Sequence, residues 1–175
     1  EIGEREVADK FTDPNACVLE IGGGAGNVST IIQKKLNNKS DHVVIQPIFG
    51  DNTERPMFGG IENLENNKKA CGSKFHIIDH VLKKGEGKEL LKLVSKPFDT
   101  IVCDCEGCLN GEYEKNPDLF EKVNMIQVER DDRPAKKNSY ERGKYNDLFD
   151  KLNMKLLHKG DGCGRACDTD VWIKK

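Results

Sequence analysis

The sequence predicts an α/β domain built on a mainly parallel β-sheet with helices on both faces. Apolar, strand-like runs alternate with helix-like segments along all 175 residues. The strand expected at 17–21 runs straight into glycines at 22–26 and then into an amphipathic helix. This strand–turn–helix order is typical of open parallel sheets that bind a ligand beyond the strand ends. The last strand is expected to run antiparallel to the others.

The predicted elements follow from local pattern. Apolar residues at helical spacing, such as Val28, Ile31, Ile32 and Leu36, indicate helices, and short apolar runs bounded by turn residues indicate strands. We expect helices over 1–11, 27–38, 61–70, 88–94, 112–122 (interrupted near Pro117) and 140–153. We expect strands over 17–21, 42–45, 75–78, 98–103, 125–129, 155–157 and 170–173.

Length and composition place limits on the class of protein. Without an internal repeat or low-complexity tract, residues 1–175 are expected to form a single domain. The chain begins at Glu1 without Met, which leaves open an excision from a longer protein. The formal net charge of −2 gives no reason to expect a nucleic-acid partner. No apolar run reaches the roughly 18 residues of a membrane span, so none is expected.

The seven cysteines allow two interpretations. Several lie within apolar, strand-like runs, as buried reduced thiols do in a cytoplasmic or other intracellular protein. The alternative is a zinc site, because thiolates are good zinc ligands. The candidate groups are Cys103, Cys105 and Cys108, and the pair Cys163 and Cys167.

The turn after the first strand has the features of a ligand site. Gly22, Gly23 and Gly24 can adopt positive φ and let the backbone approach a ligand, and a helix N-terminus follows. Glu20, just before them, can accept hydrogen bonds from an ammonium group, directly or through water. A dinucleotide fingerprint needs a later glycine that this turn lacks. A tight turn with no ligand remains the alternative.

Residues 18–27, Val-Leu-Glu-Ile-Gly-Gly-Gly-Ala-Gly-Asn, resemble the first motif of class I S-adenosylmethionine-dependent methyltransferases. Three further segments are similar to the FkbM-type group of that class: 43–47, 63–68, and 98–107 with its Asp-x-Glu-Gly. Residues 125–129 resemble its fifth strand, which ends in Glu129. The resemblance implies a Rossmann-like sheet and an EC 2.1.1-type enzyme. Its product would be S-adenosylhomocysteine, and its acceptor an oxygen atom, most often a sugar hydroxyl of a glycan or small glycoside.

Two residues complete the cofactor site that the resemblance implies. At the end of the second strand the fold normally has an acid that binds both ribose hydroxyls, but this sequence has Gln46. An amide loses the charge-assisted, bidentate contact, so we expect weaker cofactor binding or a ribose ligand from elsewhere. Asp79, after the third strand, is the candidate acceptor for the adenine amine. A solvated acid at a strand end is the alternative.

Acidic residues follow the fourth and fifth strands and predict the catalytic centre. Asp104, Glu106 and Glu129 should meet at one rim, because parallel strands end at the same edge of a sheet. Repulsion among them would raise one carboxyl pKa towards that of a general base, or recruit a divalent cation with Asp104 and Glu129 as ligands. Asp104 also borders the expected cofactor site. A role limited to orienting loops is the alternative.

Other functions remain open. The chain could methylate another small molecule or a protein, or bind a nucleotide on a similar scaffold. It could also be a degenerate methyltransferase fold that serves as a binding module, an idea that Gln46 favours and the acids oppose. The sequence does not identify the acceptor, the methylated atom or the oligomeric state.

Overall fold

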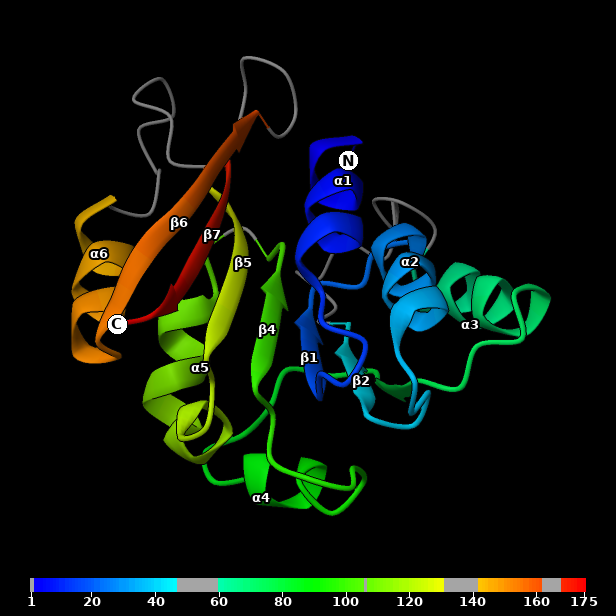
Figure 1. The fold of residues 1–175 in the computed structure, drawn as a ribbon. Helices are drawn as coiled ribbons and strands as arrows, with labels where there is room; N and C mark the ends of the chain where they lie inside the picture. Colours follow the sequence, from blue (N-terminus) through cyan, green and yellow to red (C-terminus); the bar gives the residue numbers. More distant parts are fainter. Residues whose placement is uncertain (1, 47–59, 106, 131–141, 162–167) are drawn as a thin grey trace.

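The structure is a computed structural model that describes residues 2–46, 60–105, 107–130, 142–161 and 168–175. Seven strands form one sheet, and helices lie on both of its faces (Figure 1). The helices are α1 (Ile2–Phe11), α2 (Asn27–Lys35), α3 (Gly60–Ala70), α4 (Gly87–Leu90), α5 (Leu109–Lys115), the 3-10 helix η2 (Pro117–Phe120) and α6 (Arg142–Lys151). The strands are β1 (Val18–Ile21), β2 (His42–Ile45), β3 (His76–Ile78), β4 (Thr100–Cys103), β5 (Met125–Arg130), β6 (Met154–Asp161) and β7 (Asp168–Lys174).

The strand order is β3-β2-β1-β4-β5-β7-β6. Strands β1 to β5 pair in parallel, and β7 runs antiparallel to both β5 and β6. The predicted fold class is therefore confirmed, including the antiparallel last strand. The order of the strands reverses at β1 and β4, because β2 and β3 are added on one side of β1 and β4 and β5 on the other. The carboxyl ends of β1 and β4 therefore flank the crevice where ligands bind in open α/β sheets.

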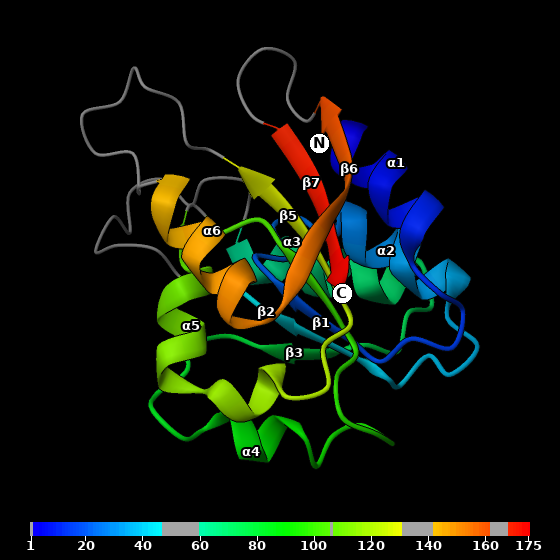
Figure 2. The ribbon, with the colours of Figure 1, turned by 60° about the vertical axis from the view of Figure 1, so that its left-hand side comes forward.

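The two faces of the sheet have separate cores, because successive side chains of a strand point to opposite faces. On one face Val18 and Val102 pack against Ile32 of α2, Leu36 just after α2, and Ala8 of α1. On the other face, Leu19, Ile101 and Ile126 pack in a larger cluster with Leu109 of α5 and Phe149 of α6. Figures 1 and 2 show α1 and α2 on one side of the sheet and α5 and α6 on the other. Every residue of β1, β2 and β4 is buried, as expected for parallel strands covered on both faces.

Most predicted elements are confirmed, with three corrections to their bounds. The helix expected over 88–94 is the single turn α4, and turns follow it. The helix expected over 112–122 begins earlier, at Leu109, and ends at Lys115. Asn116 leaves the helical region, with φ −136° and ψ 60°, because the residue before a proline is disfavoured there. Strands β6 and β7 are longer than predicted because each pairs along its whole length with a neighbour.

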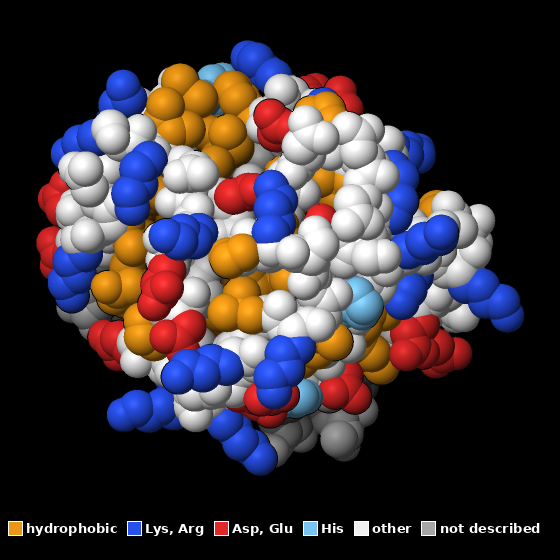
Figure 3. All heavy atoms as spheres, turned by 60° about the horizontal axis from the view of Figure 1, so that its bottom comes forward, with side chains coloured by type: hydrophobic (Ala, Val, Ile, Leu, Met, Phe, Trp, Pro, Cys, Tyr) orange, Lys and Arg blue, Asp and Glu red, His pale blue; other side chains and the backbone are white. Residues whose placement is uncertain are grey.

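Charged side chains of both signs are interspersed on the face of the molecule opposite the carboxyl ends of the parallel strands (Figure 3). This mixture agrees with the formal net charge of −2. Within the part of the chain that the structure describes, no helix is long and apolar enough to cross a membrane.

Candidate functional site

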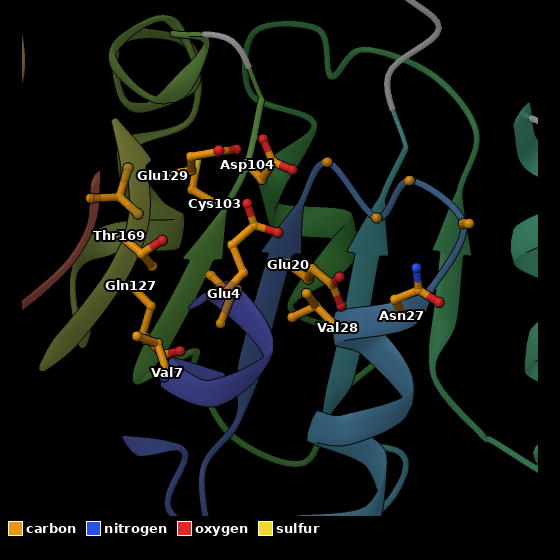
Figure 4. Close-up of a pocket in the computed structure, with 16 residues that line it drawn as sticks. Glu4, Val7, Glu20, Asn27, Val28, Cys103, Asp104, Gln127, Glu129 and Thr169 are labelled. Carbon is orange, nitrogen blue, oxygen red and sulfur yellow. The ribbon is translucent and has the colours of Figure 1, made fainter. Parts of the chain in front are cut away.

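A pocket opens at the carboxyl ends of β1, β4 and β5, between the sheet and α1 and α2 (Figure 4). Its empty volume is about 520 Å³ with the open solvent at its mouth included. The residues that line it are Glu4, Val7, Glu20, Gly22, Gly23, Gly24, Ala25, Asn27, Val28, Val102, Cys103, Asp104, Gln127, Val128, Glu129 and Thr169. Six of the predicted site residues therefore border one cavity: Glu20, Gly22, Gly23, Gly24, Asp104 and Glu129.

The glycine turn is built by close backbone packing. Gly22 has φ 92°, and a Cβ there would lie 1.6 Å from the carbonyl oxygen of Asp104. Only glycine therefore lets the ends of β1 and β4 approach this closely. Gly24 differs, because it has φ 50° and a Cβ there would meet no described atom within 4 Å. Gly24 is thus a point where a ligand can reach the backbone.

Glu20 is the buried acid of this turn, with 2% of its surface exposed. Ser29 Oγ donates a hydrogen bond to its Oε1 at 2.9 Å, and His42 Nε2 lies 2.9 Å from its Oε2. The tautomer of His42 follows from Gln33. Gln33 Oε1 accepts from the Lys74 N–H, so Gln33 Nε2 donates to His42 Nδ1 at 3.1 Å and His42 Nε2 carries the proton towards Glu20.

The contacts of Glu20 leave room for a ligand. Each carboxylate oxygen has a second lone pair, so Glu20 can still accept from an ammonium group in the pocket. Its predicted role is therefore compatible with the observed network, and it stays a prediction.

Gln46 takes part in the turn itself. Its Oε1 accepts a hydrogen bond from the Gly24 N–H at 2.6 Å. One lone pair of the side-chain carbonyl is therefore used by the backbone, and the second lone pair and the amide N–H groups remain for a ligand. Gln46 does not line the pocket, but its hydrogen bond holds the backbone of Gly24, which does line it.

Asp79 is placed apart from the pocket lining. Its side chain is 73% exposed and lies 3.2 Å from His80 Nδ1, while His80 Nε2 contacts Glu86. The predicted adenine contact of Asp79 has no supporting geometry here and stays a prediction. Glu106, the third predicted catalytic acid, lies outside the described residues.

Three carboxyl groups meet at the other end of the pocket. Oxygen atoms of Glu4, Asp104 and Glu129 lie within 4.8 Å of one another, and Figure 4 shows these side chains turned towards a common space. Burial raises the pKa of Glu129 well above its ordinary value, and hydrogen bonds and repulsion from Asp104 and Glu4 raise it further. Glu129 is therefore protonated at neutral pH, which relieves part of the repulsion among the three groups.

Helix α1 contributes the acid that the sequence analysis missed. Glu4 is 8% exposed and lies one turn before Val7 and Ala8, which are also buried. An acid at helical spacing on an apolar face is a signal that could have identified it. Its partners on β4 and β5, however, depend on where α1 packs, which no local pattern gives.

Two uncharged polar side chains of the pocket were also missed. Gln127 precedes Glu129 by two residues and so lies on the same face of β5, while Thr169 of β7 pairs directly with Glu129. Both are 2% exposed. Gln127 Oε1 and Thr169 Oγ1 have no hydrogen-bond partner among the described residues. Such buried, unsatisfied groups are costly unless a ligand or water binds them.

The cysteines require a correction. Cys105 and Cys108 form a disulfide, so the expectation of reduced thiols is wrong for this pair in the structure. Cys17, Cys71 and Cys103 are free. The other candidate zinc pair, Cys163 and Cys167, lies outside the described residues.

Comparisons with known proteins agree with this geometry. No protein-family model matches the sequence, and a search of curated proteins found no match. Among solved structures, a protein assigned as an O-methyltransferase from Klebsiella pneumoniae superposes with a TM-score of 0.65 at 12% identity, covering 98% of this chain and 80% of that one. A protein assigned as a tRNA methyltransferase from Streptococcus pneumoniae, solved with S-adenosyl-L-methionine, gives 0.65 at 10% identity, covering 97% and 71%.

A third neighbour, assigned as an RNA methyltransferase from Pyrococcus horikoshii, has a TM-score of 0.59 at 12% identity and covers 98% of this chain and 79% of its own. At such low identity these likenesses show the fold alone. It is the Rossmann-like fold of class I methyltransferases, with the pocket at the carboxyl ends of the central strands.

Proposed function

We propose that this chain is an S-adenosylmethionine-dependent methyltransferase that acts on an oxygen atom, with a sugar hydroxyl of a glycan or small glycoside as the acceptor. The observation that supports the activity is a single pocket with an open glycine turn at one end and a three-carboxyl cluster at the other. The FkbM-type resemblance of residues 98–107 and 125–129 supports the sugar acceptor.

The residues of the pocket fit a cationic cofactor. Gly24 leaves space at the backbone, and Glu20 and Asp104 offer carboxylates on the same face of the sheet. S-adenosylmethionine carries an ammonium and a sulfonium group, and both are stabilised by nearby carboxylates. When bound, it supplies an electrophilic methyl group. In this proposal Glu20, Gly22, Gly23 and Gly24 hold the cofactor, with Gln46 positioning the turn.

In this proposal the acid cluster removes the proton of the acceptor hydroxyl. Asp104 takes the proton from the acceptor hydroxyl as its oxygen receives the methyl group, which leaves a neutral ether and a protonated carboxyl. Glu129, already protonated, donates a hydrogen bond rather than adding a second negative charge. Gln127 and Thr169 would orient the acceptor through their unsatisfied oxygens. We include Glu106 in this centre on the resemblance alone.

Neighbouring structures leave the acceptor class to experiment. Two of those compared above are assigned as RNA or tRNA methyltransferases, so the expected absence of a nucleic-acid partner has no support from them. The alternative functions are methylation of another small molecule or a protein, and a degenerate fold that binds without catalysing.

The proposal is tested in two stages. Calorimetry with S-adenosylhomocysteine, NAD and ATP identifies the cofactor class, and we expect binding of S-adenosylhomocysteine only. Transfer of a labelled methyl group is then measured with mono- and oligosaccharides, phenols, protein and RNA, with and without Mg²⁺ or Mn²⁺. Binding without transfer to any acceptor favours the binding module. Preference for NAD or ATP contradicts the proposal.

A further inference from the structure

A second cluster of reactive side chains lies on the opposite face of the sheet from the acids. The side chains of Cys103 and Cys105 belong to the large core under α5, whereas Asp104, between them, belongs to the pocket, which Cys103 also borders. Alternation along the chain explains this separation, because neighbouring residues of an extended segment point to opposite faces. One sulfur atom of each of Cys103, Cys105 and Cys108 lies within 4.8 Å of the other two.

The three sulfurs lie close enough together to bind one metal ion once the Cys105–Cys108 disulfide is reduced. Cys103 Sγ lies 3.3 Å from Cys105 Sγ. Ligands of a tetrahedral zinc ion at about 2.3 Å place their sulfurs roughly 3.8 Å apart. Once the Cys105–Cys108 bond is reduced, small side-chain rotations are enough to reach that separation. The Cys108 N–H already donates to Cys105 Sγ at 3.2 Å, a contact that stabilises negative charge on sulfur.

A buried carboxyl group lies one helical turn after Cys108. Glu112 is 5% exposed, and its N–H donates to the Cys108 carbonyl oxygen. Its Oε1 lies 3.7 Å from Lys115 Nζ, whereas its Oε2 has no hydrogen-bond partner among the described residues. Glu112 is not part of the group of sulfurs that lie within 4.8 Å of one another, so its Oε2 reaches a cation bound there only after a side-chain rotation.

We propose that in the reduced protein Cys103, Cys105 and Cys108 bind a thiophilic divalent cation of the Zn²⁺ class, with Glu112 as the fourth ligand. A dithiol reductant transfers two electrons and two protons to the Cys105–Cys108 disulfide and leaves as its own disulfide. Binding then breaks the three S–H bonds, forms three sulfur–metal bonds and releases three protons. A disulfide oxidant then accepts two electrons from the Cys105 and Cys108 thiolates and two protons from solvent and leaves as a dithiol. The Cys105–Cys108 bond re-forms, the cation is released, and Cys103 takes up a proton. This site is independent of the proposed methyltransferase activity.

The test uses the full chain with Cys71, Cys163 and Cys167 changed to Ser, so that these thiols do not contribute. The reduced protein is titrated with Co²⁺, whose sulfur-to-metal charge-transfer absorption reports thiolate ligation, and then with Zn²⁺ in competition with a chromophoric chelator. We expect one ion per chain and proton release on binding. Re-forming the Cys105–Cys108 disulfide should abolish binding.

Variants separate this site from adventitious binding. Cys103→Ser and Cys108→Ser should each remove the charge-transfer band or weaken Zn²⁺ binding at least tenfold, while Cys17→Ser, a buried thiol elsewhere, should leave both unchanged. Circular dichroism checks that each variant is folded. If Cys103→Ser unfolds, Cys108→Ser still tests the site, because Cys108 is the less buried of the two positions. A reduced parent without the band, or a band retained in folded Cys108→Ser, overturns the site. Unchanged affinity in Glu112→Gln overturns its assignment as a ligand.

Discussion

Glu20 and Glu129 are two glutamates on the same face of the sheet, yet their surroundings are opposite. Glu20 faces the hydroxyl of Ser29 and the ring N–H of His42, so its charge is balanced by donors of the chain. Glu129 faces the carboxyl groups of Asp104 and Glu4, and these neighbours raise its pKa. The comparison shows that neighbours, rather than residue type, decide whether a buried acid stabilises the fold or is poised for ligand chemistry.

The two ends of the pocket should therefore respond differently to substitution. Changes at the glycine turn, near Glu20, should alter binding of the cofactor. Changes at the acid cluster, around Glu129, should alter turnover and pH dependence instead. The predictions below test this division, beginning with the largest expected effect.

Gly24→Val should abolish measurable binding of S-adenosylhomocysteine. The new side chain would fill space that no described protein atom occupies and where a ligand meets the backbone. Calorimetry on the folded variant measures the loss. Gly72→Val is the matched control, because Gly72 has a similar φ of 61° and open surroundings but is not part of the pocket lining. If folded Gly24→Val binds as well as the wild type, the cofactor site lies elsewhere.

Asp104→Asn should lower turnover by roughly 10²–10⁴-fold, the usual contribution of a general base. Glu129→Gln should lower turnover by less, because its amide can still donate a hydrogen bond. Both amides keep the size of the acid, so folding and S-adenosylhomocysteine affinity should stay close to wild type. The measurement is labelled methyl transfer to the acceptor that the panel identifies. Asp150→Asn, at an exposed position on α6, is the control. Wild-type turnover in both pocket variants would exclude the acid cluster from catalysis.

Glu129→Gln should raise thermal stability relative to wild type, and by more as the pH rises. The pKa of Glu129 is raised above its ordinary 4.5 in the fold. Above that pH the unfolded chain loses the proton while the folded chain keeps it, so the free energy of unfolding of the wild type falls. The amide does not titrate and escapes this loss. Melting curves from pH 5 to pH 8 test the trend, and a constant difference between the two proteins would contradict it.

Gln46→Glu should tighten S-adenosylhomocysteine binding by about 1 kcal/mol, roughly fivefold. One carboxylate oxygen can still accept from the Gly24 N–H, as Gln46 Oε1 does now, while the other becomes free to accept from a ribose hydroxyl. Calorimetry gives the change, and Gln46→Leu, which keeps neither contact, should weaken binding. Equal or weaker affinity in Gln46→Glu would show that the ribose is held elsewhere.

Several features of the fold were predictable because their cause is local. The run 18–21 is apolar apart from Glu20, which fits a central parallel strand, and Pro117 excludes a continuous helix. The glycines at 22–24 predicted a tight turn next to a ligand site. The lengths of β6 and β7 were less predictable, because strand length depends on pairing with a distant neighbour.

The sequence by itself determined the alternation of strands and helices, the glycine turn, and the acids after the fourth and fifth strands, since each is a property of consecutive residues. Only the tertiary structure decided that Glu4 completes the acid cluster, that Thr169 lies beside Glu129, and that Gln46 binds the Gly24 backbone. It also decided that the side chains of Cys103 and Cys105 pack in the core under α5, while Asp104 lines the pocket. These contacts join segments far apart in the chain, and their geometry is set by how helices pack on the sheet rather than by any local pattern.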